Sequence, residues 1–244
     1  MDWEEGCEEC CCVLSRYLHF NSIHAQQLNQ TGGGFALAAV TGHFSFYATL
    51  IETLNANGHD IALFFLAYDL TPSAAYPTQL RQSVAALRYI LSSRDPGNVL
   101  IGGDSAGGNL ALAVLLHLSR PHPQIEPLEI DAPLAGVFAF APWVSFRGDW
   151  PSLEGNRYKD VIPKEALAEW SAAYLGGKGK EGDAWSEPYT APTEWWGDAA
   201  RKTRQVLILA GEDEILFSAI DEFVQRFKVC FLSTFWVGLE MLTV

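Results

Sequence analysis

Apolar and polar positions along the chain follow two periods, one typical of buried strands and one typical of helices. A continuous apolar run at residues 61–68 predicts a strand covered on both faces, and residues 134–140 and 205–210 predict two further strands. Apolar side chains three or four positions apart predict helices over residues 43–57, 78–92, 163–175 and 220–228. Residues 13–20 are compatible with a further strand, and the polar run 21–31 suits a loop. This alternation predicts an α/β fold, a doubly wound and mostly parallel sheet with helices on both faces.

The middle of this pattern is a glycine-rich turn between a strand and a helix. Residues 99–101 are an apolar strand, and a helix rich in Ala and Leu follows the turn. Gly103 and Gly107 flank Ser105 in a Gly-x-Ser-x-Gly motif, in which the missing side chains let the backbone turn sharply and expose the serine. A nucleophile elbow is favoured over an exposed serine in a phosphate-binding turn. No lysine follows the glycines, which excludes a P-loop.

Two other segments offer partners for this serine. Gly32, Gly33 and Gly34 precede an apolar run, and consecutive glycines let backbone N–H groups face a ligand, as an oxyanion hole requires. A flexible linker is the alternative. Asp213 follows the strand at 205–210 and comes after the serine, in the chain order of doubly wound hydrolases. The alternative for Asp213 is a solvated acidic turn that caps the next helix.

A base to activate the serine is missing from the expected position. A serine hydroxyl attacks efficiently only when a base takes its proton, and in this chain order that base is a histidine after the acid. All six histidines precede Asp213: they are His19, His24, His43, His59, His117 and His122. Each is predicted to be a loop or surface histidine, except that His117 lies on the helix after the elbow.

Length and composition narrow the class of protein. The 244 residues fit one large α/β domain, and 49% hydrophobic against 18% charged residues indicates a globular chain. The net charge of -13 argues against nucleic acid and against anionic membrane surfaces as partners. Membrane association is not indicated by the apolar tail at 229–244 either, because a spanning helix needs about 20 residues.

The first residues are acidic and rich in cysteine. Residues 1–12 hold four of the five cysteines and are predicted to be a disordered leader. Cys7 and Cys10 form a Cys-x-x-Cys pair, but no second pair completes a zinc site, so a reduced thiol cluster is favoured over a metal site. We expect no metal and no cofactor. The start lacks the pattern of a signal peptide, which predicts an intracellular, cytoplasmic location.

Several motifs together resemble one known family. They are the elbow Gly102-Gly-Asp-Ser-Ala-Gly-Gly-Asn109, the triple glycine, Ala67-Tyr-Asp-Leu-Thr-Pro72 and Tyr76-Pro-Thr-Gln-Leu80. This combination resembles the hormone-sensitive-lipase-like branch of the α/β-hydrolases and, within it, fungal steryl acetyl hydrolases, over most of residues 32–228. The resemblance implies that Ser105 is the nucleophile and Asp213 the triad acid. It also implies an oxyanion hole built from the amides of Gly33, Gly34 and Ala106.

The sequence departs from the family pattern at two places. The family has His-Gly-Gly-Gly directly after a strand, whereas Thr31 precedes the glycines here, and deleting residues 20–31 would join His19 to Gly32. Past Lys228 the family continues to a strand and the catalytic histidine, whereas this chain has the apolar tail 229–244. We hypothesise that both segments are foreign to a hydrolase domain at 13–228, for instance as retained introns or gene-prediction errors.

The sequence therefore predicts a serine carboxylic ester hydrolase that works through an acyl-serine intermediate. Its expected substrate is a small apolar ester, such as an acetyl group on an apolar alcohol. The alternative is a catalytically inactive hydrolase fold that binds an apolar ligand or a partner protein, which the missing histidine favours. A lyase or transferase on the same fold is a third possibility. Tryptophans that could line a substrate pocket, or simply fill the core, are Trp143, Trp150, Trp170, Trp185, Trp195 and Trp196.

Overall fold

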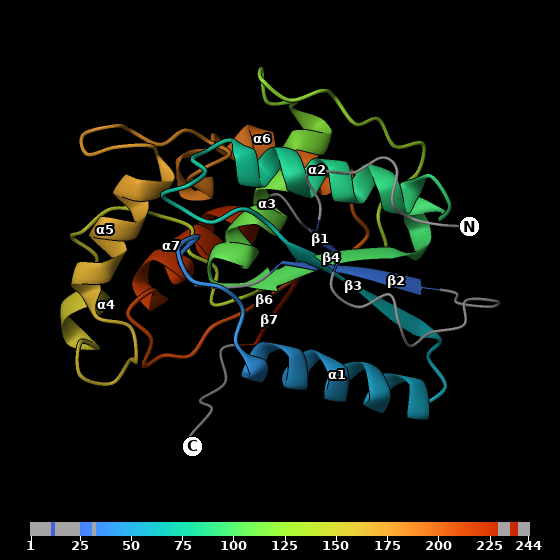
Figure 1. Cartoon of the computed structure of the whole chain (residues 1–244), viewed down its shortest axis with the longest axis horizontal. Helices are drawn as coiled ribbons and strands as arrows, with labels where there is room; N and C mark the ends of the chain where they lie inside the picture. Colours follow the sequence, from blue (N-terminus) through green and yellow to red (C-terminus); the bar gives the residue numbers. More distant parts are fainter. Residues whose placement is uncertain (1–10, 13–24, 31–32, 229–234, 239–244) are drawn as a thin grey trace.

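A computed structural model describes residues 11–12, 25–30, 33–228 and 235–238, and all structural statements below concern these residues (Figure 1). The strands are β1 (Cys11–Cys12), β2 (Ala25–Gln30), β3 (Ile61–Ala67), β4 (Val99–Asp104), β5 (Gly136–Phe140), β6 (Val206–Leu209) and β7 (Phe235–Gly238). The α-helices are α1 (Thr41–Ala56), α2 (Thr78–Leu91), α3 (Ala106–Ser119), α4 (Pro151–Gly155), α5 (Lys164–Tyr174), α6 (Thr193–Ala200) and α7 (Phe217–Lys228). Two short 3-10 helices lie at Pro96–Asn98 and Pro188–Thr190.

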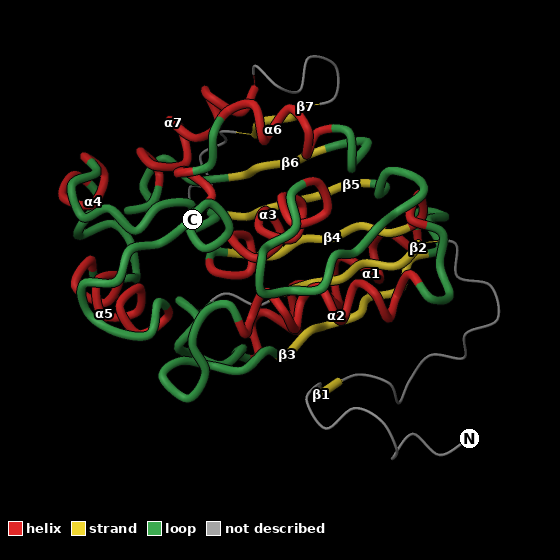
Figure 2. The backbone as a smooth tube through the Cα atoms, turned by 90° about the horizontal axis from the view of Figure 1, so that it is seen from above, coloured by secondary structure: helices red, strands yellow, loops and turns green. Residues whose placement is uncertain are grey.

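The strands form a single sheet in the order β1-β3-β2-β4-β5-β6-β7. Every neighbouring pair is parallel except β1 with β3, which is antiparallel. β4 lies at the centre, with Ile101 paired to Leu28 on one side and to Val137 on the other. Figure 2 shows the strands side by side, with α2 and α3 crossing the sheet. The predicted doubly wound parallel sheet with helices on both faces is confirmed.

The helices are distributed unequally over the two faces of the sheet. Figure 1 shows α2, α3, α6 and α7 on one face, called here the closed face, and α1 on the other, called the open face. Val137, Ala139, Val206 and Ile208 point to the closed face and are buried. The side chains that alternate with them point to the open face and are half-buried: Phe138, Phe140, Leu207 and Leu209. The core of the protein therefore lies mainly under the closed face.

Helix α3 forms the centre of that core. Each residue from Ala106 to Leu118 is buried. The strands pack against one side of α3, and α2 and α6 pack against its other sides. A helix that is apolar all round is expected to be enclosed rather than amphipathic. The Ala- and Leu-rich run after the elbow is therefore the sequence signature of this central position.

Two segments that the sequence placed outside the fold contribute strands. β2 lies within the predicted loop at 21–31, so that prediction is wrong for residues 25–30, which pair with β3 on one side and β4 on the other. β7 lies within the apolar tail and pairs with β6. The polar sequence of β2 gave no strand signal. It can nevertheless form a strand, because strand pairing uses backbone N–H and C=O groups, which almost every residue carries. The strand expected at 13–20 and the Cys7–Cys10 pair lie outside the described residues.

Smaller differences concern the termini and the long loops. Residues 11–12 form β1, although the leader was predicted to be disordered as far as residue 12. The expected loop at 142–163 contains α4, and the irregular stretch at 176–200 contains α6. Of the helices in the described part of the chain, none combines the length and the apolar character needed to cross a membrane.

Candidate active site

Ser105 lies at the sharp turn between β4 and α3. Its φ of 51° and ψ of -114° fall outside the regions that side-chain-bearing residues normally occupy, a strain of order 1–3 kcal/mol. Its N–H donates to the carbonyl oxygen of Phe140 at 2.8 Å, and its own carbonyl accepts from the N–H groups of Asn109 and Trp143 at 3.0 and 3.1 Å. These three hydrogen bonds hold the strained backbone in place. The geometry is that of the predicted nucleophile elbow.

Neighbouring glycines let other segments approach this turn closely. A Cβ on Gly102 would lie 2.2 Å from the ring of Phe138, and a Cβ on Gly108 would lie 3.0 Å from that of Pro142. Both contacts bring the end of β5 and the loop after it against the elbow. Larger residues at these positions would push the two apart.

Asn109 fixes the elbow to two loops. Its buried side-chain amide donates to the carbonyl oxygens of Trp143 and Ser186, each at 2.8 Å. Buried carbonyls left without such a donor cost about 1–3 kcal/mol each. The sequence marked Asn109 as part of the elbow motif but gave no sign of this role, because both partners are distant in the chain.

The predicted glycine loop adopts a conformation that needs glycine. Gly33 and Gly34 have φ values of 113° and 59°, and a Cβ on Gly34 would lie 2.1 Å from the ring of Trp170. The carbonyl of Gly33 accepts from the N–H of Leu37 at 2.8 Å, which closes the turn. Gly32 lies outside the described residues. The flexible-linker alternative does not fit so tightly packed a turn.

Phe35 connects the glycine loop to the elbow. Its ring is fully buried and stacks on Tyr174, with ring centroids 3.8 Å apart and planes 6° apart. It also packs against the ring of Trp143 at 6.2 Å, and the N–H of Trp143 is the one that binds the Ser105 carbonyl. The glycine loop and the serine turn are thus parts of one packed unit.

The acidic turn after β6 carries two carboxylates with different surroundings. The Asp213 side chain is 70% exposed, and its Oδ1 lies 2.6 Å from Nζ of Lys159. The Glu214 side chain turns inward instead: its Oε1 accepts from the N–H of Gly211 at 3.0 Å. Its second oxygen, Oε2, is shielded from solvent and has no hydrogen-bond partner in the described part of the chain. The sequence motif predicts Asp213 as the acid and gives no signal for Glu214.

The turn that carries Glu214 is fixed from outside by α4 and the loop after it. Asn156 donates to the carbonyl oxygens of Glu212 and Glu214 at 2.8 Å each, and Asp160 accepts from the N–H of Ile215 at 2.8 Å. Burial raises the pKa of the Glu214 carboxyl, the amide of Gly211 lowers it, and the negative charge of Asp160 raises it again. The balance favours a carboxyl that holds its proton more tightly than an exposed one.

A cavity of about 620 Å³ opens on the open face beside the elbow. It is lined by α1 and by the ends of β4, β5 and β6: Val40, Gly42, His43, Phe46, Tyr47, Asp104, Phe140, Ala141, Leu209, Ala210, Gly211 and Glu214. Asp104 and Phe140 both adjoin Ser105, the first in sequence and the second through its carbonyl. A second cavity of about 390 Å³ lies at the opposite end of α3, against Ser119. Only the first of these two touches the elbow.

His43 is the histidine of this cavity, but both of its ring nitrogens have partners. Nδ1 accepts from the N–H of Val40 at 3.1 Å, so the ring proton is on Nε2. Nε2 in turn faces Oδ2 of Asp104 at 3.4 Å. His43 therefore pairs with the residue before Ser105, and no ring nitrogen is left to take the serine proton.

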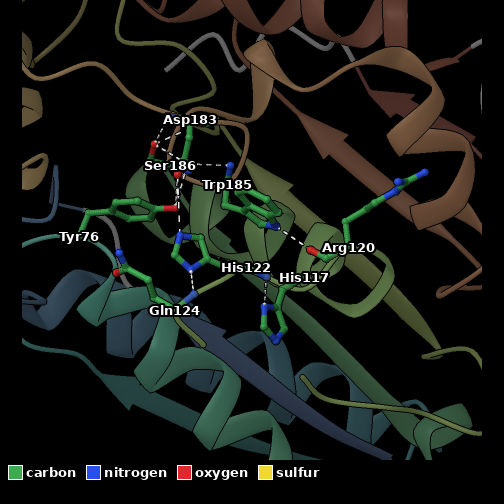
Figure 3. Close-up of polar contacts among 8 residues, drawn as sticks. All are labelled: Tyr76, His117, Arg120, His122, Gln124, Asp183, Trp185 and Ser186. Atoms are coloured by element: carbon green, nitrogen blue, oxygen red, sulfur yellow. Dashed lines mark hydrogen bonds and ion pairs between the residues drawn. The ribbon is translucent and has the colours of Figure 1, made fainter. Parts of the chain in front are cut away.

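The two histidines that are buried in the described part of the chain belong to a different region of the molecule (Figure 3). His117 accepts from the N–H of His122 at 3.0 Å, and His122 faces Asp183 at 3.8 Å. Asp183 also accepts from the hydroxyl of Tyr76 and from Ser186, whose carbonyl receives the Asn109 amide. Burial lowers the pKa of both histidines. This cluster is structural: it fastens the loop after α5 to the segment just before α2 and to the end of α3.

The tryptophans divide between core and glycine loop. Trp143, Trp150 and Trp196 are buried in the hydrophobic core, as the simpler interpretation of these residues predicted. Trp170 is partly buried and lies against Gly34. None of the six lines the 620 Å³ cavity among the described residues. The sequence-based proposal of a tryptophan-lined pocket stays unsupported for this cavity.

The turn at Ser105, the parallel sheet and the strand order match one family of enzymes. A family model described as alpha/beta hydrolase fold matches residues 29–232. The chain belongs to the α/β-hydrolase fold family. The match includes residues 32–228, over which the sequence motifs resemble the α/β-hydrolases, so the predicted family is confirmed. It extends past both ends of that range.

Individual α/β-hydrolases share part of their length with this chain. Steryl acetyl hydrolase 1 of Saccharomyces cerevisiae is 28% identical over 198 residues, which are 76% of this chain and 44% of the relative. Neutral cholesterol ester hydrolase 1 of Mus musculus is 38% identical over 158 residues, 60% of this chain and 36% of the relative. The chain thus spans less than half of these relatives. A solved esterase of the bacterial hormone-sensitive lipase family has the same fold, with a TM-score of 0.72 at 23% identity, over 90% of this chain and 67% of that one.

Proposed function

We propose that this α/β-hydrolase cleaves carboxylic esters through an acyl intermediate on Ser105. The observation that carries the proposal is the strained turn at Ser105, with φ of 51°, between the central strand and the buried helix α3. A glycine at this position would relieve the backbone strain. A strained serine is therefore expected where its side chain is needed for function. The strain supports a role in which the serine hydroxyl must stand clear of the backbone.

The amides of Gly33, Gly34 and Ala106 are the proposed oxyanion hole. Ala106 begins α3, and the first N–H groups of a helix have no acceptor within it. The helix N-terminus also carries partial positive charge, which favours an oxyanion there. The N–H of Gly34 has no acceptor among the described residues, and its loop is packed to the elbow through Phe35.

The proposed substrate is an ester of acetate or another short acid with an apolar alcohol. The names of the curated relatives, a steryl acetyl hydrolase and a cholesterol ester hydrolase, support this choice over that of a non-catalytic binding protein. The acid of the site lies on the turn after β6, where Asp213 is the residue that the sequence motif proposes. No metal or cofactor is needed for this chemistry.

Labelling with a fluorophosphonate and hydrolysis of p-nitrophenyl acetate test the proposal together. We expect mass spectrometry to find the label on Ser105, and Ser105→Ala to lose both the label and the enzymatic rate. Turnover should be slow, because without a base a serine hydrolase keeps only what the oxyanion hole and binding provide. Ser93→Ala, at an exposed serine, is the matched control. Equal rates in the Ser105→Ala variant and the parent chain would refute the proposal.

A further inference from the structure

The histidine cluster at the end of α3 brings buried titratable groups together outside the candidate active site (Figure 3). His117 is fully buried, and His122 is 4% exposed. The rings of Tyr76 and Trp185 stand edge-on to that of His122, with centroids 5.5 and 5.1 Å away. A buried imidazole is stable in its neutral form, because a charged ring loses its hydration. The cluster is therefore expected to respond to acid.

The hydrogen bonds of His117 determine where its single ring proton lies. Nδ1 accepts from the backbone N–H of His122 at 3.0 Å. Nε2 lies 3.3 Å from the carbonyl oxygen of Glu126, which can only accept. The proton is therefore on Nε2, and the lone pair of Nδ1 is used by the amide. A second proton can bind only at Nδ1, where it would face the N–H of His122 and break that hydrogen bond.

The surroundings of His117 oppose a charge on its ring. Burial is the largest effect and lowers the pKa of this ring. The carbonyl of Glu126 raises the pKa, while the charges of His122 and of Arg88, on α2, lower it. The Glu126 carboxylate is 82% exposed and lies 3.6 Å from Arg88 instead. A proton on His117 is thus opposed by burial and by two neighbours.

His122 is held in the same tautomer but faces a carboxylate. Its Nδ1 accepts from the N–H of Gln124 at 3.1 Å, and its Nε2 lies 3.8 Å from Oδ2 of Asp183. Burial lowers the pKa of this ring, Asp183 raises it, and Arg81 of α2 lowers it. The carboxylate partly compensates a charge on His122. His117 is therefore the ring whose protonation disturbs the cluster more.

Asp183 connects the histidines to the elbow. It accepts from the hydroxyl of Tyr76 at 2.8 Å, and from the N–H and the hydroxyl of Ser186 at 2.9 and 3.0 Å. The carbonyl of Ser186 accepts from the side-chain amide of Asn109 at 2.8 Å. The N–H of Asn109 in turn donates to the carbonyl of Ser105 at 3.0 Å. Direct contacts therefore run from the cluster to the strained serine backbone.

We propose that this cluster is an acid-sensitive latch on the elbow, with His117 as the group that titrates. A proton from solvent binds the Nδ1 lone pair and leaves the N–H of His122 without an acceptor, which displaces the His122 ring from Asp183. The loop at 183–186 then releases the elbow, so that Ser105 loses its exact placement while the core stays folded. The effect on Ser105 rests on the proposed esterase function.

The pH range of the latch follows from the direction of the shift. Because burial lowers the pKa of His117, the closed form binds the extra proton less tightly than the open form, in which the ring reaches solvent. The closed form is therefore favoured fully above the ordinary histidine pKa of about 6.5. It is lost as the pH falls through the lower pKa of the buried ring.

Trp185 gives an optical signal for the latch in the whole chain. Its ring centroid lies 5.1 Å from that of His122, and indole emission depends on the charge and the distance of a neighbouring imidazole. We expect the emission of the parent to change reversibly as the pH falls below about 6.5, and Trp185→Phe to lose this change. Constant emission down to the pH at which the chain unfolds in acid would overturn the latch.

His117→Asn tests which ring titrates. The asparagine side chain offers an oxygen close to the place of Nδ1 and takes up no proton, so the amide of His122 keeps an acceptor at every pH. We expect this variant to lose the emission change, while His59→Asn, at an exposed histidine, keeps it. Circular dichroism checks that each variant is folded. A folded His117→Asn variant that keeps the change would overturn the role of His117.

Arg88→Gln tests the same assignment without altering the buried ring. The Arg88 side chain is 41% exposed, and its charge lowers the pKa of His117. Its removal should move the emission change to higher pH, whereas Lys228→Gln, at an exposed cation at the end of α7, should leave the midpoint in place. A midpoint that stays unchanged or falls in Arg88→Gln would contradict the assignment.

Fluorophosphonate labelling connects the latch to the proposed reaction. We expect His117→Asn and the parent to be labelled at equal rates at about pH 8, and the variant several-fold faster at about pH 5, on the acid side of the ordinary histidine pKa. Equal rates at both pH values, with label on Ser105, would overturn the coupling to the elbow. No label on Ser105 at any pH would refute the esterase proposal, and the emission of the parent and of the two variants would still decide the latch.

Discussion

The closed and open faces of the sheet differ in how completely they are covered and in what they contain. On the closed face, α3 and its neighbours bury every apolar side chain that β5 and β6 direct toward them. On the open face, α1 leaves Phe138, Phe140, Leu207 and Leu209 half-exposed. The open face also carries Asp104, His43 and Glu214 around the cavity. Buried apolar side chains are therefore concentrated on one side of the sheet, and the candidate chemistry lies on the other.

The elbow lies where the two faces meet, because β4 ends at Ser105 and α3 begins there. Helix α3, which follows Ser105, is enclosed on the closed face. Asp104, which precedes Ser105, pairs with His43 on the open face. A rigid helix behind an accessible turn is the arrangement that a nucleophile needs, since precise placement depends on rigid support. We expect three measurements to detect this difference between the two faces.

The largest effect is expected from shortening a leucine on each face. Leu116→Ala removes a fully buried side chain from α3 and should lower the free energy of unfolding by about 2–5 kcal/mol. Leu207→Ala removes a half-buried one from the open face and should cost less than about 1.5 kcal/mol, because less apolar area is lost and solvent fills the space. Urea unfolding of both variants measures the difference. Equal losses would mean that the open face is as closely packed as the other.

A smaller effect is expected where the elbow strand meets the open face. Gly102→Ala would place a Cβ 2.2 Å from the Phe138 ring, and we expect a cost of about 1–3 kcal/mol from overpacking. In a Phe138→Ala background the same change should cost less than about 0.5 kcal/mol, because the obstructing ring is gone. Gly148→Ala, where no atom lies within 4 Å of the new Cβ, is the control. Additive losses would show that the cost of the new Cβ does not come from the Phe138 ring.

The smallest effect concerns pH and the Glu214 carboxyl. Burial raises its pKa, partly opposed by the Gly211 amide and helped by Asp160, so the folded protein holds this proton more tightly than the unfolded chain does. Its stabilising contribution is therefore full below the ordinary glutamate pKa and is lost as the pH rises through the folded value. Glu214→Gln, always neutral, should unfold at a higher urea concentration than the parent at neutral pH, and this advantage should vanish in acid.

Urea midpoints between about pH 4 and pH 8 measure this dependence, since the range spans the ordinary glutamate pKa of about 4.3. Glu212→Gln, on an exposed neighbour in the same turn, is the matched control and should show no such pH-dependent gain. A Glu214→Gln variant that is less stable than the parent at neutral pH would show that the charged carboxylate, and not the neutral one, suits the fold.

Much of the fold can be predicted from local sequence patterns, because buried faces of helices and strands place apolar residues at regular spacings. β3, α2 and α7 were predicted to within a few residues, and β4, Ser105 and α3 were found from glycine spacing and an apolar run. The glycine loop was identified for the same reason, since its φ values are open to glycine and strained for other residues. Such features depend on neighbours in the chain.

Other features depend on neighbours in space, and the sequence could not supply them. β2 is polar and became a strand only because the backbones of β3 and β4 lie on both sides of it. The role of Asn109 depends on carbonyls 34 and 77 positions away. The residues around the elbow motif give no indication of either partner.

The acidic turn shows the division most clearly. Sequence order alone determined that an acid follows β6 on the same edge of the sheet as Ser105. Which acid faces the cavity was decided by the tertiary structure, in which Asp213 points outward beside Lys159 while Glu214 turns inward and accepts from the N–H of Gly211. Consecutive side chains on a tight turn point in different directions, and their orientation is set by the groups that surround the turn rather than by the order of its letters.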